Sequence, residues 1–342
     1  MTRPSTASSR SCSARSRDGS RDVDDHRARL AGSAPAKASP ATPRRRLRGS
    51  PTFTFWLFTG PFLIGLAIFV YAPILWSLWL SFFEARFTVT PDKFVGFDNY
   101  TYMLTNDDFV GSLGTFTVFA AFIVPTTWAL SLGLALLVNR MRFMRAFFRS
   151  VFFLPTAVSY VAASLIWKMS IFSGVRFGLM NTVLGWFGVE NIAWLIDPNP
   201  PWYWLVIVSA RLWLQSGFYM ILFIAALQNI PEELYEAAAI DGAKSGWQTF
   251  WHITLPQLRA TSTAVILLLL VAAYQAFDEF FNLLSKTTWG RPPLMELYYK
   301  ALGESQDYGA GSAGALILTV LICAVTLLQG KFMGFGRGDE SK

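Results

Sequence analysis

Long runs of uncharged, largely apolar residues alternate with short charged segments from residue 51 onward. No charged residue occurs from 49 to 83 or from 109 to 139. Each run exceeds the roughly 20 apolar residues that an α-helix needs to cross a bilayer. The pattern predicts an all-α membrane protein with six transmembrane helices, near 55–82, 113–138, 147–169, 202–228, 260–284 and 309–333.

The positions of the basic residues predict how these helices are oriented. Four arginines lie just before the first run, within 44–48, and four more follow the second predicted helix, within 140–149. Lys and Arg concentrate in cytoplasmic loops of membrane proteins. We therefore expect both termini, and the loops after the second and fourth helices, on the cytoplasmic side of an inner membrane.

Composition narrows the function classes. Charged residues make up 15% of the chain, whereas soluble domains carry about 25%. With two cysteines and two histidines, neither a disulfide framework nor a metal site is expected, and no cofactor is predicted. The net charge of +7 lies mostly in the N-terminal tail and beside apolar runs, so nucleic acid is not expected as a partner. An RNA-binding tail is the less favoured alternative.

The same patterns divide the chain into four regions. Residues 1–50 are rich in Ser, Arg, Ala and Pro and predict a disordered, basic cytoplasmic tail. Residues 51–110 contain the first transmembrane helix and an external loop, 111–334 the core with five helices, and 335–342 a second cytoplasmic tail. An uncharged stretch at 177–189 is too short to span and predicts an interfacial or buried helix.

The cytoplasmic loop at 229–258 carries the most specific pattern. Asn229 is a candidate N-cap, and two glutamates at 232–233 face the positive end of a helix dipole. Gly242 can end that helix in the left-handed conformation, Ser245 can cap a second helix, and Pro256 marks the start of the fifth transmembrane helix. The pattern predicts a helix-turn-helix that projects from the membrane domain.

This loop resembles the EAA loop of the permease subunits of bacterial ABC importers. Ten residues, rather than the family's nine, separate Gly242 from Ile253, which leaves the register of the second helix open. The resemblance implies docking on a cytoplasmic ATPase dimer, with Glu236 paired to a basic residue and Gly242 making the turn. The matching positions are Glu236, Ala237, Ala238, Gly242, Ile253, Leu255 and Pro256.

Further segments resemble the sugar-importing, maltose-type branch of these permeases. They are Phe94–Tyr100, Leu154–Pro155, Ala193–Pro198, Phe277–Asp278 and Tyr308–Ala315. The resemblance implies the type I importer permease fold, a second permease subunit, an extracytoplasmic solute-binding protein, and import of a monosaccharide or oligosaccharide by alternating access. ATP hydrolysis would then occur in a partner chain, and this chain would not be an enzyme.

Ionisable and amide side chains inside predicted helices form a second candidate site. Such groups are costly in a bilayer, so they usually pair or line a cavity. If the fourth and fifth helices pack together, Arg211 can face Asp278 or Glu279. These side chains form either the wall of a sugar pathway or a structural ion pair between helices. The candidates are Arg211, Gln215, Tyr219, Gln275, Asp278 and Glu279.

Three other functions compete with a sugar importer. One is an ion-gradient-driven secondary transporter, although no internal repeat relates 55–170 to 200–335. Another is an ABC importer for a non-sugar solute such as a glycerol phosphate. The third is a membrane-embedded enzyme, for which two histidines provide little chemistry. The chain also has no phosphate-binding loop of its own, so an importer would need a separate ATPase.

Overall fold

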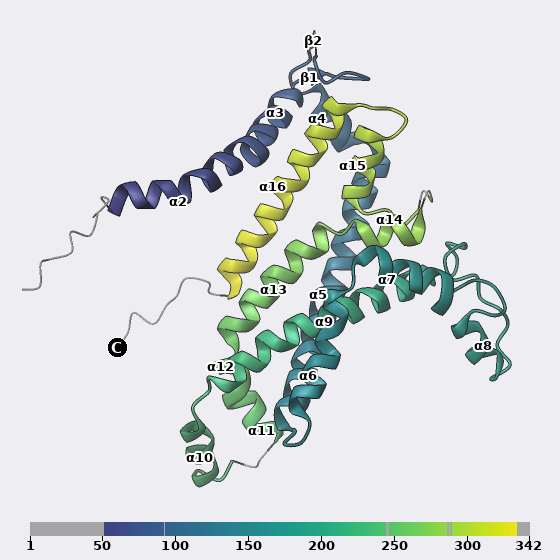
Figure 1. Ribbon diagram of the computed structural model, residues 1–342. Coiled ribbons are helices and arrows are strands. Elements are labelled where there is room, and N and C mark those ends of the chain that lie inside the picture. The colour runs from purple at the N-terminus through teal and green to yellow at the C-terminus, as the bar shows by residue number, and fades with distance from the viewer. Residues whose placement is uncertain (1–50, 92, 244–245, 286, 288, 334–342) are drawn as a thin grey trace, which may run out of the picture. The chain divides into compact units, whose positions relative to one another are not determined.

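The first uncharged run forms a helix from Pro51 to Leu80, as its apolar composition predicts (Figure 1). The computed structural model describes residues 51–333 apart from 92, 244–245, 286 and 288, so both predicted tails lie outside it. The chain divides into two units, residues 1–64 and 65–342. The first helix comprises α2 (Pro51–Leu66), a π-helical segment η1 (Ala67–Tyr71) and α3 (Ala72–Leu80).

The second unit is built around one long helix, α5 (Asp107–Arg140), which contains Pro125. Asn106 caps it by accepting a hydrogen bond from the Phe109 amide. Helices α9 (Tyr203–Gln228) and α13 (Arg259–Tyr274) pack against α5. The remaining long helix, α16 (Tyr308–Met333), packs against α13, α4 (Asp98–Thr105) and α15 (Pro293–Leu302).

The third predicted transmembrane helix is not continuous. It consists of α6 (Arg145–Phe153), a 3₁₀ turn η2 (Leu154–Ala157), α7 (Tyr160–Ile166) and a π-helical segment η3 (Trp167–Ile171), with a 96° bend between 157 and 160. The prediction of one helix over 147–169 is therefore wrong. Pro155 has no amide hydrogen to continue the helix, and the Ser159 side chain caps α7 by accepting from the Ala162 amide.

The fifth predicted helix is also broken. Helix α13 ends at Tyr274, and the chain then leaves helical geometry before α14 (Asp278–Leu284). Asp278 and Glu279 occupy the first turn of α14, where the helix dipole favours negative charge. By length and composition, the described residues contain four single helices able to span a membrane, or six spans if each of two bent pairs counts as one. The expectation of one unbroken fifth helix over 260–284 is wrong.

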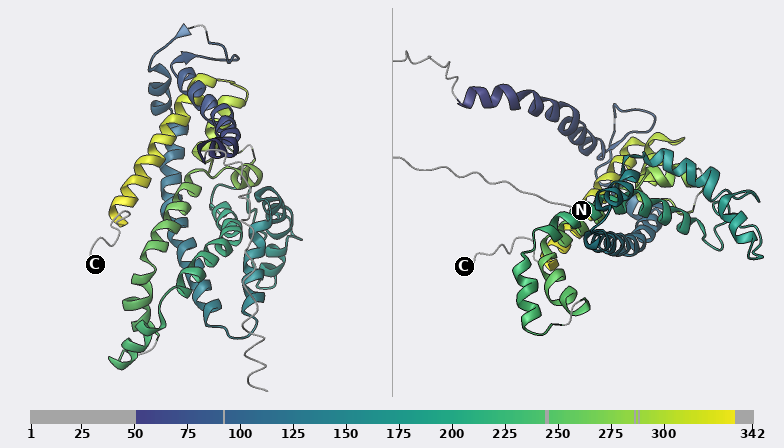
Figure 2. Two further views of the ribbon diagram at one scale, coloured as in Figure 1. Left: turned by 60° about the vertical axis from the view of Figure 1, so that its left-hand side comes forward. Right: turned by 60° about the horizontal axis from the view of Figure 1, so that its bottom comes forward.

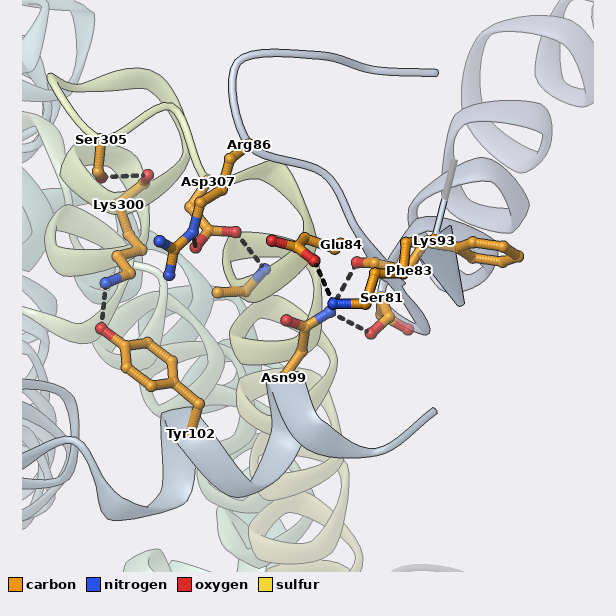
Figure 3. Close-up of polar contacts among 11 residues, drawn as sticks. Ser81, Phe83, Glu84, Arg86, Lys93, Asn99, Tyr102, Lys300, Ser305 and Asp307 are labelled. Carbon is orange, nitrogen blue, oxygen red and sulfur yellow. Dashed lines mark hydrogen bonds and ion pairs between the residues drawn. The ribbon is translucent and has the colours of Figure 1, made fainter. Parts of the chain in front are cut away.

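The ends of the first and last long helices meet in a polar cap, drawn in Figure 3. The Asn99 side-chain amide donates to the carbonyls of Ser81 and Phe83, at 2.9 and 2.8 Å. Arg86 Nε donates to Asp307 Oδ2 at 3.0 Å. Two short strands, β1 (Phe83–Glu84) and β2 (Lys93–Phe94), pair antiparallel beside this cap. The short helix α8 (Leu179–Gly185) lies within the uncharged stretch predicted to be helical.

Helices α6 and α9 approach closely at Gly217. A Cβ atom at that position would overlap the backbone carbonyl of Phe152. The aromatic core lies nearby between α5, α9 and α14, where the Phe116 and Phe280 rings are 5.0 Å apart. Gly217 therefore permits the crossing that places α6 and the bend after it.

We expect Gly217→Ala to destabilise the protein by about 1–3 kcal/mol, because the added methyl group must push α6 away from α9. Thermal unfolding in detergent measures the change. The matched control is Gly133→Ala in α5, where a Cβ meets nothing within 4 Å and alanine favours the helix. Equal unfolding temperatures for the two variants would contradict the close crossing.

Candidate functional site

The loop after α9 contains the predicted helix-turn-helix. Helix α10 (Glu232–Ile240) begins after Pro231, with two glutamates in its first turn. The prediction that Asn229 is the N-cap of α10 is wrong. Helix α9 continues to Gln228, and the Asn229 amide donates to the Ala226 carbonyl. Gly242 does adopt the left-handed conformation, with φ of +80°. The helix thus ends where the sequence predicts, and the Ala243 amide donates to the Ala238 carbonyl at 2.9 Å.

Helix α10 offers an uncovered surface. Glu236 and Ala237 are exposed, Ala238 is half-buried and Ile240 is 86% exposed. Among the described residues, no ion pair involves Glu236. The helix therefore presents a carboxylate, small alanines and a bare isoleucine together. Figure 1 shows α10 and α11 at one end of the second unit, and the cap with β1 and β2 at the other.

The second half of the loop folds as α11 (Trp247–Thr249), a π-helical segment η4 (Phe250–Thr254) and α12 (Leu255–Gln257). Ile253 and Leu255 are half-buried, whereas Pro256 is exposed. The predicted cap Ser245 lies outside the described residues. A π-helical turn holds one residue more than an α-helical turn, so η4 offers a place for the additional residue in this loop. The bend to α13 is 70°.

The two halves of the loop are tied together and stand over a cavity. Tyr235 Oη lies 3.2 Å from Thr254 Oγ1. A cavity of about 320 Å³ separates this pair from the end of α5, where Asn139 and Arg140 line it. This hydrogen bond links α10 to η4, the segment that leads into α12 and α13.

In the membrane region the structure brings Arg211 and Glu279 together. Both are buried, at 2% and 3% exposure, and Arg211 Nη1 pairs with Glu279 Oε1. Arg211 Nη2 donates to the Ala272 carbonyl at 2.6 Å. The chain break after α13 deprives that carbonyl of its helical partner, since the Ala276 amide donates to Ala273 instead. Arg211 thus joins α9 to both sides of the break.

The other predicted pathway residues are placed differently. Gln215 Nε2 donates to Tyr160 Oη at 2.8 Å, and Tyr219 is buried. Gln275 and Asp278 are exposed at the break and make no ion pair with Arg211. Of the two carboxylates considered as partners of Arg211, Glu279 is the one it contacts. The sequence did not predict a role for Tyr160 or for the Ala272 carbonyl. Ser159, a typical N-cap residue, is the signal that could have located the start of α7.

A larger cavity, of about 1080 Å³, lies between α7, α14 and α15. Lys168 Nζ donates to the Asn282 carbonyl at 3.0 Å and to Ser285 Oγ at 2.8 Å, linking the two broken helices. Aromatic rings stand along one wall, with the Phe281 and Tyr298 centroids 5.4 Å apart. Beside it, burial raises the pKa of Glu296, although Arg291 at 3.2 Å acts in the opposite direction.

Comparison with known proteins identifies the family. Residues 126–332 match the model of the family described as binding-protein-dependent transport system inner membrane component. The chain belongs to this family. The matched residues include the whole loop at 229–258, both bent helix pairs and most of α16. The fold of this inner membrane component thereby agrees with the permease fold that the sequence predicted.

Several curated relatives cover most of this inner membrane component. The osmoprotective compounds uptake permease protein of Synechocystis sp. is 30% identical over 79% of this chain and 95% of its own length. The trehalose/maltose transport system permease protein of Thermococcus litoralis is 31% identical over 81% and 92%. The alpha-glucoside transport system permease protein of Rhizobium meliloti is 29% identical over 84% of each chain.

A solved structure shares the fold. The crystal structure of a bacterial ABC transporter involved in the import of the acidic polysaccharide alginate matches with a TM-score of 0.73. At 21% identity it covers 84% of this chain and 96% of the matched chain. The overall fold of this chain is therefore one that an experimentally determined transporter also adopts.

Because removing one member of a buried pair strands the other charge, we expect Glu279→Gln to destabilise the protein by about 3–5 kcal/mol. The neighbouring exposed carboxylate provides the control, Asp278→Asn, which should unfold at the wild-type temperature. The double variant Arg211→Met/Glu279→Leu should recover part of the loss, because it removes both charges but leaves the Ala272 carbonyl without its Arg211 donor. Wild-type stability of Glu279→Gln would contradict the pairing.

Proposed function

We propose that this chain is the permease subunit of an ATP-driven importer of monosaccharides or oligosaccharides. Its family membership supports a transport role across the inner membrane. Relatives named for alpha-glucoside and for trehalose/maltose transport support a sugar as the cargo. The chain itself catalyses no reaction; ATP is hydrolysed by a separate partner, and the solute crosses by alternating access.

The observation that carries the proposal is the uncovered helix α10. Ile240 is 86% exposed one turn after Glu236 on α10, and Trp247 in α11 is 75% exposed. Large apolar side chains grouped at such a projection mark a protein contact. We infer that α10 docks in a groove of a cytoplasmic ATPase dimer, with both chain ends on the cytoplasmic side. Residues 236–238, 242, 253, 255 and 256 form or support this docking surface.

Two further partners complete the transporter. The π-helical part of the first helix leaves Phe69 79% exposed, and α3 leaves Leu75 62% exposed. Such faces contact lipid or another membrane helix, and we infer a second permease subunit. A crystal structure of a bacterial alginate ABC transporter in complex with alginate pentasaccharide-bound periplasmic protein shares the fold of this chain. By this similarity, an extracytoplasmic solute-binding protein delivers the cargo to the end opposite α10.

The break between α13 and α14 is the proposed wall of the sugar pathway. Irregular backbone at membrane depth is tolerated where it lines a water-filled cavity. Gln275 and Asp278 are exposed there and can exchange hydrogen bonds with sugar hydroxyls. Gln215 and Tyr219 lie on the neighbouring α9. The Arg211–Glu279 pair neutralises its own charges and positions this wall.

A second candidate cargo is a non-sugar osmoprotective solute, because the Synechocystis relative is named for osmoprotective compounds. Uptake of radiolabelled sugars and osmolytes by a strain lacking this chain, with and without its restoration, separates the two. A secondary transporter would still import its cargo after the partner ATPase is inactivated, whereas an ABC importer would not.

Reversing the charge of Glu236 tests the docking surface. We expect Glu236→Lys to abolish co-purification with the ATPase, because the lysine repels the basic residue expected in the groove. The matched control is Glu304→Lys, an exposed glutamate in the turn after α15, which should retain the ATPase. Both variants should unfold at the wild-type temperature. Retention of the ATPase by Glu236→Lys would count against the coupling role of α10.

The pathway is tested by uptake in Asp278→Asn. We expect uptake to fall at least about tenfold, the effect of weakening one or two hydrogen bonds to the moving solute, while thermal stability stays at the wild-type value. Uptake rates are measured in whole cells at matched expression. Unchanged uptake would remove Asp278 from the pathway while leaving the permease assignment intact.

A further inference from the structure

Four arginines gather where α5 ends and α6 begins; we call Arg140, Arg142, Arg145 and Arg149 the basic elbow. No Asp or Glu occurs between residues 109 and 189. The chain reverses at Met144, whose φ of +56° lies in the left-handed region. Figure 1 and the left view of Figure 2 show the turn between α5 and α6 at the same end of the unit as α10.

The elbow is held closed by one of its own arginines and lacks negative charge. Arg145 Nη2 donates to the backbone carbonyl and to Oδ1 of Asn139 in the last turn of α5. Within the described part of the chain, Arg149 Nε and Nη2 are buried with no acceptor, and none of the four arginines forms an ion pair. Arginine at the first position of α6 also opposes the helix dipole. An external anion would supply the missing negative charge and would be favoured at the start of α6.

The exposed side chains around the basic elbow include many large apolar ones. Phe143, in the turn itself, is 82% exposed, and Leu137 lies 61% exposed one turn before Arg140 on α5. Phe147, Val151 and Leu154 share one face of α6 and η2, at 54%, 45% and 68% exposure. Arginines at the edge of an exposed apolar surface are typical of the headgroup level of a bilayer. The missing anion therefore belongs to an amphiphile.

We propose that the basic elbow binds the phosphate headgroup of an anionic phospholipid in the cytoplasmic leaflet, with acyl chains against Leu137 and the apolar face of α6. The inference rests on the orientation proposed above. An acidic surface of the ATPase could satisfy the arginines, but it would leave Phe143 and Phe147 bare in water. A lipid satisfies both the charges and the apolar face, and it would brace α6 below the 96° bend that leads to α7.

Native mass spectrometry of the purified, delipidated chain tests this site, with dioleoyl-phosphatidylglycerol and dioleoyl-phosphatidylcholine as probes. We expect phosphatidylglycerol to bind more tightly than phosphatidylcholine. Arg142→Gln should weaken phosphatidylglycerol binding about fivefold, the effect of one cation near an anionic lipid surface, and leave phosphatidylcholine binding unchanged. Arg149→Gln should act in the same direction. If Arg149→Gln does not fold, the exposed Arg142 carries the test.

The matched control is Arg176→Gln, an exposed loop arginine outside the elbow, which should keep wild-type lipid binding. Equal binding of the two lipids, or an equal loss in Arg176→Gln, would overturn the proposal. Displacement of phosphatidylglycerol by 10 millimolar inorganic phosphate would instead identify a site for free anions. Loss of ATPase co-purification in Arg142→Gln without any change in lipid binding would identify a protein contact. The lipid-binding measurement itself uses neither ATPase nor sugar, so its outcome is separate from that of the transport proposal.

Discussion

The polar centre of the membrane region depends on the contact of Arg211 with Glu279 and with the Ala272 carbonyl. A bilayer supplies no hydrogen bonds, so a helix that breaks within it must find partners for the backbone groups it frees. Arg211 donates a hydrogen bond to the freed Ala272 carbonyl and forms an ion pair with Glu279 in the first turn of α14. A buried pair of this kind adds little net stability but is costly to split. Its value here is geometric, because it fixes the ends of α13 and α14 against α9.

The second broken helix is joined to the first. Lys168 in η3 donates to the Asn282 carbonyl of α14 and to the hydroxyl of Ser285, the residue that follows α14. Helices α7 and α14 also pack directly against each other. The two irregular regions are therefore bonded to each other as well as packed together.

The sequence was sufficient for the number and order of the apolar segments, because bilayer thickness imposes a length that the runs of uncharged residues display. It also located the Gly242 turn, since only a residue free of Cβ strain ends a helix there easily. The breaks at 158–159 and 275–277 were missed. Pro155 was compatible with a tolerated kink, and nothing near Tyr274 departs from helical composition. The partner of Arg211 depended on packing between distant helices, so sequence left two carboxylates as candidates.

The α10 end of the unit carries both the acidic loop at 229–258 and the basic elbow, so its net charge would be a misleading guide to membrane orientation. The loop at 229–258 carries four carboxylates on or beside α10, yet the orientation rule depends on Lys and Arg, to which Asp and Glu add little. The structure explains how both can occupy one side. The four carboxylates are exposed on the loop where we propose that a protein partner binds, whereas exposed apolar side chains such as Phe143 and Phe147 flank the arginines. In the proposed transporter, the acidic arm moves with the ATPase while the basic elbow keeps its lipid at the bilayer boundary.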